Sequence, residues 1–191
     1  MIRCFVMGCL FGLWCMGLAA RAADISMLQA TEFLPSIDSP TVPKAAKVVT
    51  NDTEINLSMD LDSLVANADG LKIEDSASMQ GDMIVEQPGF VSLPVMVITV
   101  SGHIIKTAHS TARIDLQVGA ASRRFFWGSD DVQSGRYSFT ITETVADGKV
   151  PPLFPVTVLA FVTKDPGDGA VLVSLEKIQV KLGNFAAVAL H

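Results

Sequence analysis

The chain has 191 residues, with 14 Lys and Arg against 20 Asp and Glu, so its formal net charge at pH 7 is −6. Nucleic acids and anionic lipid surfaces attract clusters of Lys and Arg, and the sequence contains no such cluster, so we expect no nucleic-acid partner. The three cysteines, Cys4, Cys9 and Cys15, all lie in the first 22 residues. The remaining chain therefore cannot have a disulfide framework, a thiol nucleophile or a cysteine metal site.

The first 22 residues have the pattern of a cleaved secretory signal. Arg3 supplies the positive start, residues 4–18 form a 15-residue apolar segment, and small residues precede a cut after Ala22. A membrane-spanning helix needs about 20 apolar residues, so we expect no membrane span after cleavage. The pattern predicts an exported protein, either periplasmic or extracellular. The alternatives are an uncleaved anchor and a lipoprotein attached through Cys9.

Residues 23–47 are expected to form an extended arm. Pro35, Pro40 and Pro43 lie there among Ser, Asp and Thr, and proline excludes a regular helix and favours extended chain. We expect the globular domain to begin near Val48 and to cover 48–191.

Beyond the arm, apolar and polar residues alternate with period two, which is typical of a strand with one buried face. The clearest stretches are 54–64, 111–118 and 136–145, and further candidate strands are 47–50, 71–75, 83–87, 95–106, 123–127, 154–164 and 170–182. Turn residues separate these stretches. The turn Asp165-Pro166-Gly167-Asp168 predicts a hairpin that joins the last two long strands.

In the last of these strands the alternation changes phase. The apolar residues occupy odd positions over 171–175 and even positions over 178–182. One extra residue near Glu176 and Lys177 would return both halves to the same core, and this is the definition of a β-bulge. The alternative is a strand that passes from one sheet to another.

About ten short strands with tight turns and no long helical pattern predict an all-β fold, an antiparallel β-sandwich of jelly-roll-like type. The alternative is an immunoglobulin-like sandwich. Residues 135–141, GRYSFTI, have the form GxYxFxI and precede two long strands. In this order the second half of the chain resembles the galactose-binding-like jelly rolls. The resemblance implies a fold and says little about function.

The densest aromatic stretch is Arg123-Arg124-Phe125-Phe126-Trp127, which contains the single Trp of residues 23–191. On a strand, Phe125 and Trp127 share one face and Phe126 takes the other, so we expect at least one ring at the surface. An exposed ring can stack on the apolar face of a sugar while neighbouring polar side chains bind its hydroxyl groups.

Three polar residues of one strand face, Arg113, Asp115 and Gln117, could supply those hydrogen bonds. Together with Trp127 they form the candidate ligand site. The sequence predicts no cofactor; Asp130 and Asp131, in one loop, are candidate ligands for a structural calcium ion, because calcium prefers carboxylate and carbonyl oxygens.

We find no catalytic constellation in the sequence, so three functions are ranked. The first is a non-catalytic module that binds a carbohydrate or polysaccharide. The second is a cell-surface or periplasmic assembly or adhesion component, with residues 23–47 docking on a protein partner by strand addition. The third is a glycan-active hydrolase, which would need two carboxyl groups across a cleft.

Overall fold

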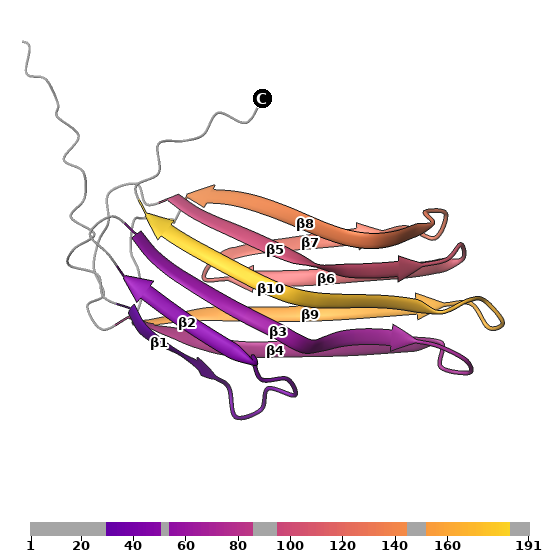
Figure 1. The fold of residues 1–191 in the computed structure, drawn as a ribbon, viewed down its shortest axis with the longest axis horizontal. Helices are drawn as coiled ribbons and strands as arrows, with labels where there is room; N and C mark the ends of the chain where they lie inside the picture. The colour runs from indigo at the N-terminus through magenta and orange to yellow at the C-terminus, as the bar shows by residue number, and fades with distance from the viewer. Residues whose placement is uncertain (1–29, 51–53, 86–94, 145–151, 184–191) are drawn as a thin grey trace, which may run out of the picture.

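The structure is a computed structural model that describes residues 30–50, 54–85, 95–144 and 152–183, so the predicted signal lies outside the described residues (Figure 1). Its strands are β1 Ala30–Pro35, β2 Ala45–Thr50, β3 Glu54–Ala68, β4 Glu74–Val85, β5 Val95–Lys106, β6 Ser110–Val118, β7 Ala121–Trp127, β8 Gln133–Thr144, β9 Leu153–Lys164 and β10 Val171–Gly183. They form two five-stranded antiparallel sheets. We name each sheet by its central strand: the β9 sheet has the order β1-β4-β9-β6-β7, and the β10 sheet has the order β2-β3-β10-β5-β8.

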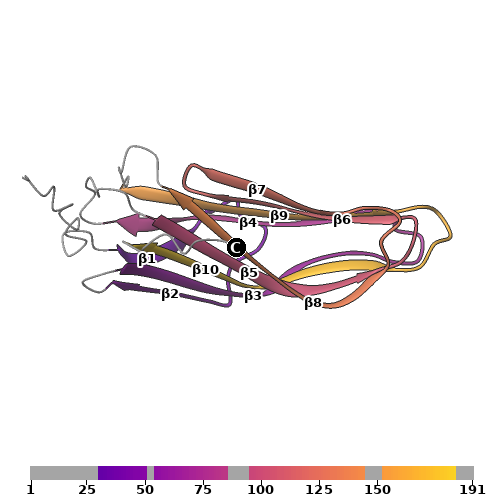
Figure 2. The same ribbon diagram turned by 90° about the horizontal axis from the view of Figure 1, so that it is seen from above.

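The strand order is that of a jelly roll. From β3 to β10 successive strands alternate between the two sheets, except for the hairpin β6–β7. As a result β3-β10-β5-β8 faces β4-β9-β6-β7, which is an eight-stranded jelly roll, and β2 and β1 each extend one sheet at its edge. Figure 2 shows the two layers packed face to face. The predicted antiparallel jelly-roll sandwich is confirmed, and the immunoglobulin-like alternative is not.

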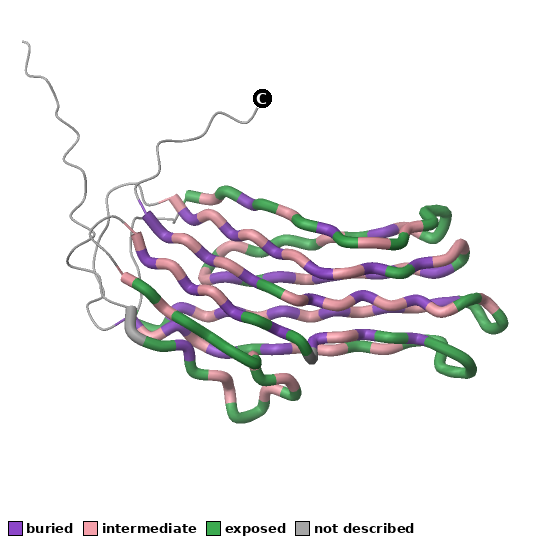
Figure 3. The backbone as a smooth tube through the Cα atoms, viewed as in Figure 1, coloured by how far each residue is buried: buried purple, intermediate pink, exposed green. Residues whose placement is uncertain are grey.

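The core lies between the sheets and follows the two-residue period of the sequence. Buried and partly exposed residues alternate along most strands (Figure 3), so that each strand gives one side chain in two to the interior. The β9 sheet contributes residues such as Met79, Ile114 and Val158, and the β10 sheet contributes residues such as Leu57 and Val173, all with 0% exposure. In the part of the chain that the structure describes, we find no helix long and apolar enough to cross a membrane.

The predicted bulge in β10 is confirmed. Against β5, Leu175 pairs with Gly102 and Lys177 pairs with Ser101, so Glu176 is the extra, unpaired residue of the bulge. The register with β3 shifts at the same place. The buried positions of β3 also change from odd, ending at Leu61, to even, beginning at Leu64. The central part of the β10 sheet is therefore irregular in two neighbouring strands.

The predicted hairpin between the last two strands is wrong in its pairing, although its turn is correct. Gly167 has a φ of +93° and the amide of Asp168 donates to the carbonyl of Asp165 at 3.2 Å, as in a type II turn. However, β9 pairs with β4 and β6, whereas β10 pairs with β3 and β5. The connection crosses between sheets about 10 Å apart. It is held by the buried Lys164, whose ammonium donates to the carbonyls of Gly70 and Asp168 at 3.0 and 2.8 Å.

The structure also corrects the predicted domain boundary at Val48. Residues 30–35 pair with β4 and residues 45–50 pair with β3, so the proline-containing segment is part of the sandwich and is not a free arm. Strand β4 is longer than the two short stretches predicted there, because small or apolar Ala77, Met79 and Gly81 alternate with polar residues. A methyl group on Gly81 would lie 2.4 Å from the ring of Phe33, so glycine makes room for β1.

We therefore expect Phe33→Ala to destabilise the protein by about 3 kcal/mol, because it empties a core position. Phe33 is 7% exposed, whereas Ile37, four residues further along, is 102% exposed and is the matched control. Ile37→Ala should change stability by less than about 0.5 kcal/mol. Urea unfolding followed by circular dichroism measures both variants. Equal stability of the two would show that the segment is not packed on the core.

Candidate functional site

The outer surface of the β9 sheet carries the polar residues that the sequence singled out. Since Ala112, Ile114 and Leu116 point into the core, Arg113, Asp115 and Gln117 of β6 lie on the outer face. The pairing places Arg113 between Phe126 of β7 and Phe161 of β9, and the next row places Asp115 between Arg124 of β7 and Leu159 of β9. We call this surface, formed by Arg113, Asp115, Gln117, Arg124, Phe126, Leu159 and Phe161, the arginine face.

A single carboxylate links two guanidinium groups on the arginine face. Oδ1 of Asp115 accepts a hydrogen bond from Nε of Arg124 at 2.6 Å, and Oδ2 lies 3.0 Å from Nε of Arg113. The second contact is an ion pair without a well-directed hydrogen bond, since the buried Nε of Arg113 has no aligned acceptor among the described residues. The hydrogen bond with Asp115 raises the pKa of Arg124, so this guanidinium stays charged.

The ring of Phe161 fixes the position of the Arg113 side chain. The guanidinium carbon of Arg113 lies 5.1 Å from the centre of this ring, a cation–π distance. The Arg113 side chain is 31% exposed and the Arg124 side chain is 64% exposed. One arginine is therefore held against the sheet and the other stands in solvent.

The aromatic stretch places a different ring at the surface from the one expected. Trp127 is 8% exposed and packs against Tyr137 and Phe139, with ring centres 5.3 and 5.7 Å apart, while Phe125 stacks on Phe139 at 4.2 Å. These rings close the core between the edge strands β7 and β8. Phe126 is 61% exposed on the arginine face. Of the two faces of this strand, the one with Phe126 is therefore turned outward, and the Trp127 ring is not available to a ligand.

Gln117 lies beside the ion pairs of the arginine face but is not part of them. Its side-chain amide donates to the carbonyl of Gly119 at 3.4 Å, and the residue is exposed. It is paired with Ser122 of β7, one row beyond Asp115. Gln117 therefore extends the polar surface along β6.

The loop with Asp130 and Asp131 already contains a cation. The ammonium of the buried Lys106 donates to the carbonyls of Thr107 and Ser129, at 3.2 and 3.4 Å, and to that of Asp131. Burial lowers the pKa of Lys106, and the nearby carboxylates of Asp131 and Asp130 act against this shift. Among the described residues, no three His, Cys, Asp or Glu side chains are placed to hold a metal ion. Calcium that used these loop carbonyls as ligands would have to displace the ammonium.

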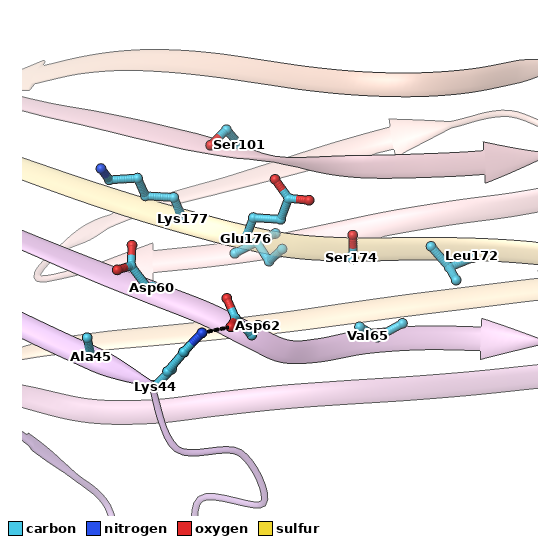
Figure 4. Close-up of a pocket in the computed structure, with 11 residues that line it drawn as sticks. Lys44, Ala45, Asp60, Asp62, Val65, Ser101, Leu172, Ser174, Glu176 and Lys177 are labelled. Carbon is cyan, nitrogen blue, oxygen red and sulfur yellow. Dashed lines mark hydrogen bonds and ion pairs between the residues drawn. The ribbon is translucent and has the colours of Figure 1, made fainter.

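A groove that the sequence did not indicate lies on the opposite surface, over the irregular part of the β10 sheet (Figure 4). It has a volume of about 680 Å³ and is lined by Lys44, Ala45, Asp60, Asp62, Val65, Ser101, Leu172, Ser174, Leu175, Glu176 and Lys177. We call it the bulge groove. Two carboxylates of this groove have ion-pair partners. Asp62 Oδ2 lies 2.5 Å from Nζ of Lys44, and Glu176 Oε1 lies 2.5 Å from Nδ1 of His103.

His103 links the groove to the edge strand β8. Nε of Arg136 donates to Nε2 of His103 at 3.4 Å, so Nε2 is the acceptor and Nδ1 carries the proton that is donated to Glu176. The bulge turns Glu176 toward this histidine. The one sequence signal for the groove was the phase change in β10, which predicts a bulge but not a hollow.

Comparisons with known proteins give no family. No family model matches the chain, and no curated protein sequence matches it. Among solved structures, a CBM36-1 domain of a multidomain xylanase from the hindgut metagenome of Trinervitermes trinervoides is 15% identical, with 82% of this chain and 98% of that chain covered and a TM-score of 0.30. TmCBM61 in complex with β-1,4-galactotriose is 13% identical, with 84% and 94% covered and a TM-score of 0.31. An infectious bursal disease virus structure is 8% identical, with 82% and 37% covered and a TM-score of 0.36. Likenesses this distant carry no argument about function.

Lys106→Met tests the role of the buried ammonium. The variant keeps the apolar stem and leaves three loop carbonyls without a charged donor, so we expect a loss of about 2 kcal/mol in unfolding free energy. Lys47→Met, on the exposed surface of β2, is the control and should change stability by less than about 0.5 kcal/mol. Unfolding in urea measures both.

Thermal unfolding with and without calcium tests the calcium prediction. In the wild type we expect equal melting temperatures in millimolar calcium and in EDTA, because the ammonium occupies the carbonyl oxygens. Calcium that raises the melting temperature of the wild type but not of Asp131→Asn would contradict this account of the loop.

Proposed function

We propose that the chain is an exported, non-catalytic module that binds a glycan on its arginine face. The observation that carries the proposal is an exposed aromatic ring, Phe126, directly beside two guanidinium groups held by one carboxylate. An aromatic ring gives the apolar face of a sugar a flat surface to stack on. Arginine N–H groups donate to sugar oxygens, and Asp115 and Gln117 can accept hydrogen bonds from hydroxyl groups.

The regular geometry of the β9 sheet supports this proposal. Between β4 and β9, β9 and β6, and β6 and β7, the pairing has no register shift. Residues two apart on one strand are about 6.6 Å apart, and neighbouring strands are about 4.8 Å apart. The outward side chains therefore form straight rows, and a linear glycan can contact several of them at once.

The carboxylates of the arginine face favour binding over hydrolysis. A glycosidase needs two carboxyl groups flanking the bond that it cleaves, and among the residues that define this face only Asp115 has one. Asp115 is engaged by Arg113 and Arg124, and Glu143, on β8 of the other sheet, is paired with Arg123. In the bulge groove the carboxylates are Asp60, Asp62 and Glu176, of which Lys44 holds Asp62 and His103 holds Glu176.

A role in assembly or adhesion is the second candidate, and its place in the structure differs from the one first expected. Residues 30–35 and 45–50 already pair within their own sheets, so they are not available as a docking arm. The 12-residue strand β8 pairs only with β5 among the described residues. An exposed edge of this kind can accept a strand from a protein partner. Such a contact would not depend on Phe126.

We expect Phe126→Ala to weaken glycan binding by about tenfold or more, because losing a stacked ring costs roughly 1.5 kcal/mol or more. Affinity electrophoresis in gels that contain neutral and acidic polysaccharides measures the loss. Leu71→Ala is the control, since Leu71 is also a solvent-exposed apolar residue, at 101%, and lies on the loop between β3 and β4.

The two variants should have the same melting temperature as the wild type, because both side chains are exposed. Retention that Phe126→Ala leaves unchanged would place any glycan elsewhere on the protein. Wild-type protein that migrates freely through the whole panel would contradict glycan binding itself and favour the second candidate.

A further inference from the structure

The arginine face has the opposite charge from the rest of the protein. The whole chain carries a net charge of −6. Yet Arg113, Arg123 and Arg124, three of the four arginines in the described residues, lie on the neighbouring strands β6 and β7. Arg123 is paired with Glu143. On the arginine face itself, two guanidinium groups share the single carboxylate of Asp115, which leaves one positive charge uncompensated.

The two arginines also have free donors. Both contact Asp115 through Nε, and no terminal nitrogen of either guanidinium has a hydrogen-bond partner among the described residues. A guanidinium has five N–H groups in a planar fork, four of them on its terminal nitrogens. These are the groups that bind a carboxylate in a bidentate manner.

Contacts on this surface restrain both arginines before a ligand arrives, Arg113 more than Arg124. Asp115 holds both groups from one side, and the ring of Phe161 lies 5.1 Å from the guanidinium carbon of Arg113. Arginine that is stacked on a ring and paired through Nε loses less side-chain freedom when it binds an anion. Phe126, in the same row as Arg113, is placed to contact the ring that carries the anion.

From these contacts we infer that the ligand of the arginine face is an acidic glycan whose uronate carboxylates bind Arg113 and Arg124. This inference rests on the proposed glycan-binding function and names its substrate class. A sugar ring stacks on Phe126, and its carboxylate replaces water at the free N–H groups of the two arginines. Since the protein as a whole is acidic, its long-range field repels a polyanion. Retention of a polyanion therefore requires this local site and cannot come from general charge attraction.

Polygalacturonate and its fully methyl-esterified form provide the test, because they have the same backbone and differ in the free carboxylate. Isothermal titration with oligomers of both, at about 0.15 M salt where the screening length is about 8 Å, should give at least about tenfold tighter binding of the acid by the wild type. Arg124→Gln should lose about tenfold in affinity for the acid and should bind the two forms equally. Arg136→Gln is the control, because Arg136 is an exposed arginine on β8, in the other sheet, and should leave the preference unchanged.

The outcomes separate the inference from the proposed function. Equal binding of acid and ester that still depends on Phe126 would keep the glycan-binding function and overturn the acidic-ligand inference. Preference for a sulfated galactan over both galacturonans would also overturn it, because the anion recognised would then not be a carboxylate. Absence of binding to any charged or neutral glycan would refute the function and the inference together.

Discussion

The extra residue in β10 is the constraint on which the two-layer structure depends. β10 lies at the centre of its sheet, and its inward positions change from odd to even at Glu176. Without that residue Ile178, Val180 and Leu182 would turn to solvent, because a slip of one residue reverses the faces of a strand. Burying each of these side chains is worth about 1.5–3 kcal/mol. Gly102 lets β5 follow the bulge, since a methyl group there would lie only 1.9 Å from the carbonyl oxygen of Ser174.

The bulge also makes the two outer surfaces different. In the β10 sheet, the shared irregularity of β3 and β10 leaves a hollow lined by mixed charges, and Glu176 is turned toward His103. In the β9 sheet, the four strands β4, β9, β6 and β7 pair without a register shift, so their outward side chains stay in rows. Within the described ranges, the regular surface is the one that presents an exposed ring beside free guanidinium donors. The asymmetry of the two sheets therefore favours the arginine face as the binding surface.

The two-residue period of the sequence was sufficient to predict the class of fold and the β10 bulge, because alternation directly reports which face of a strand is buried. It could not predict which strands pair, since the turn at Asp165–Asp168 has the same local form whether the chain returns to its own sheet or crosses to the other. It also did not predict the edge strand β1, because the prolines at its end and after it indicated an extended segment without strand pairing. For the site, alternation placed Arg113 and Asp115 together, but the choice between Phe126 and Trp127 depended on which face of an edge strand meets the core.

The most direct test of the central claim is to locate the glycan by NMR. Amide chemical shifts of uniformly ¹⁵N-labelled protein would be followed during titration with galacturonate oligomers. The account predicts that the largest changes occur at Arg113, Asp115, Arg124 and Phe126 on β6 and β7, with little change at Asp60 or Glu176 in the bulge groove. Changes centred on the bulge groove, with the arginine face unaffected, would contradict it.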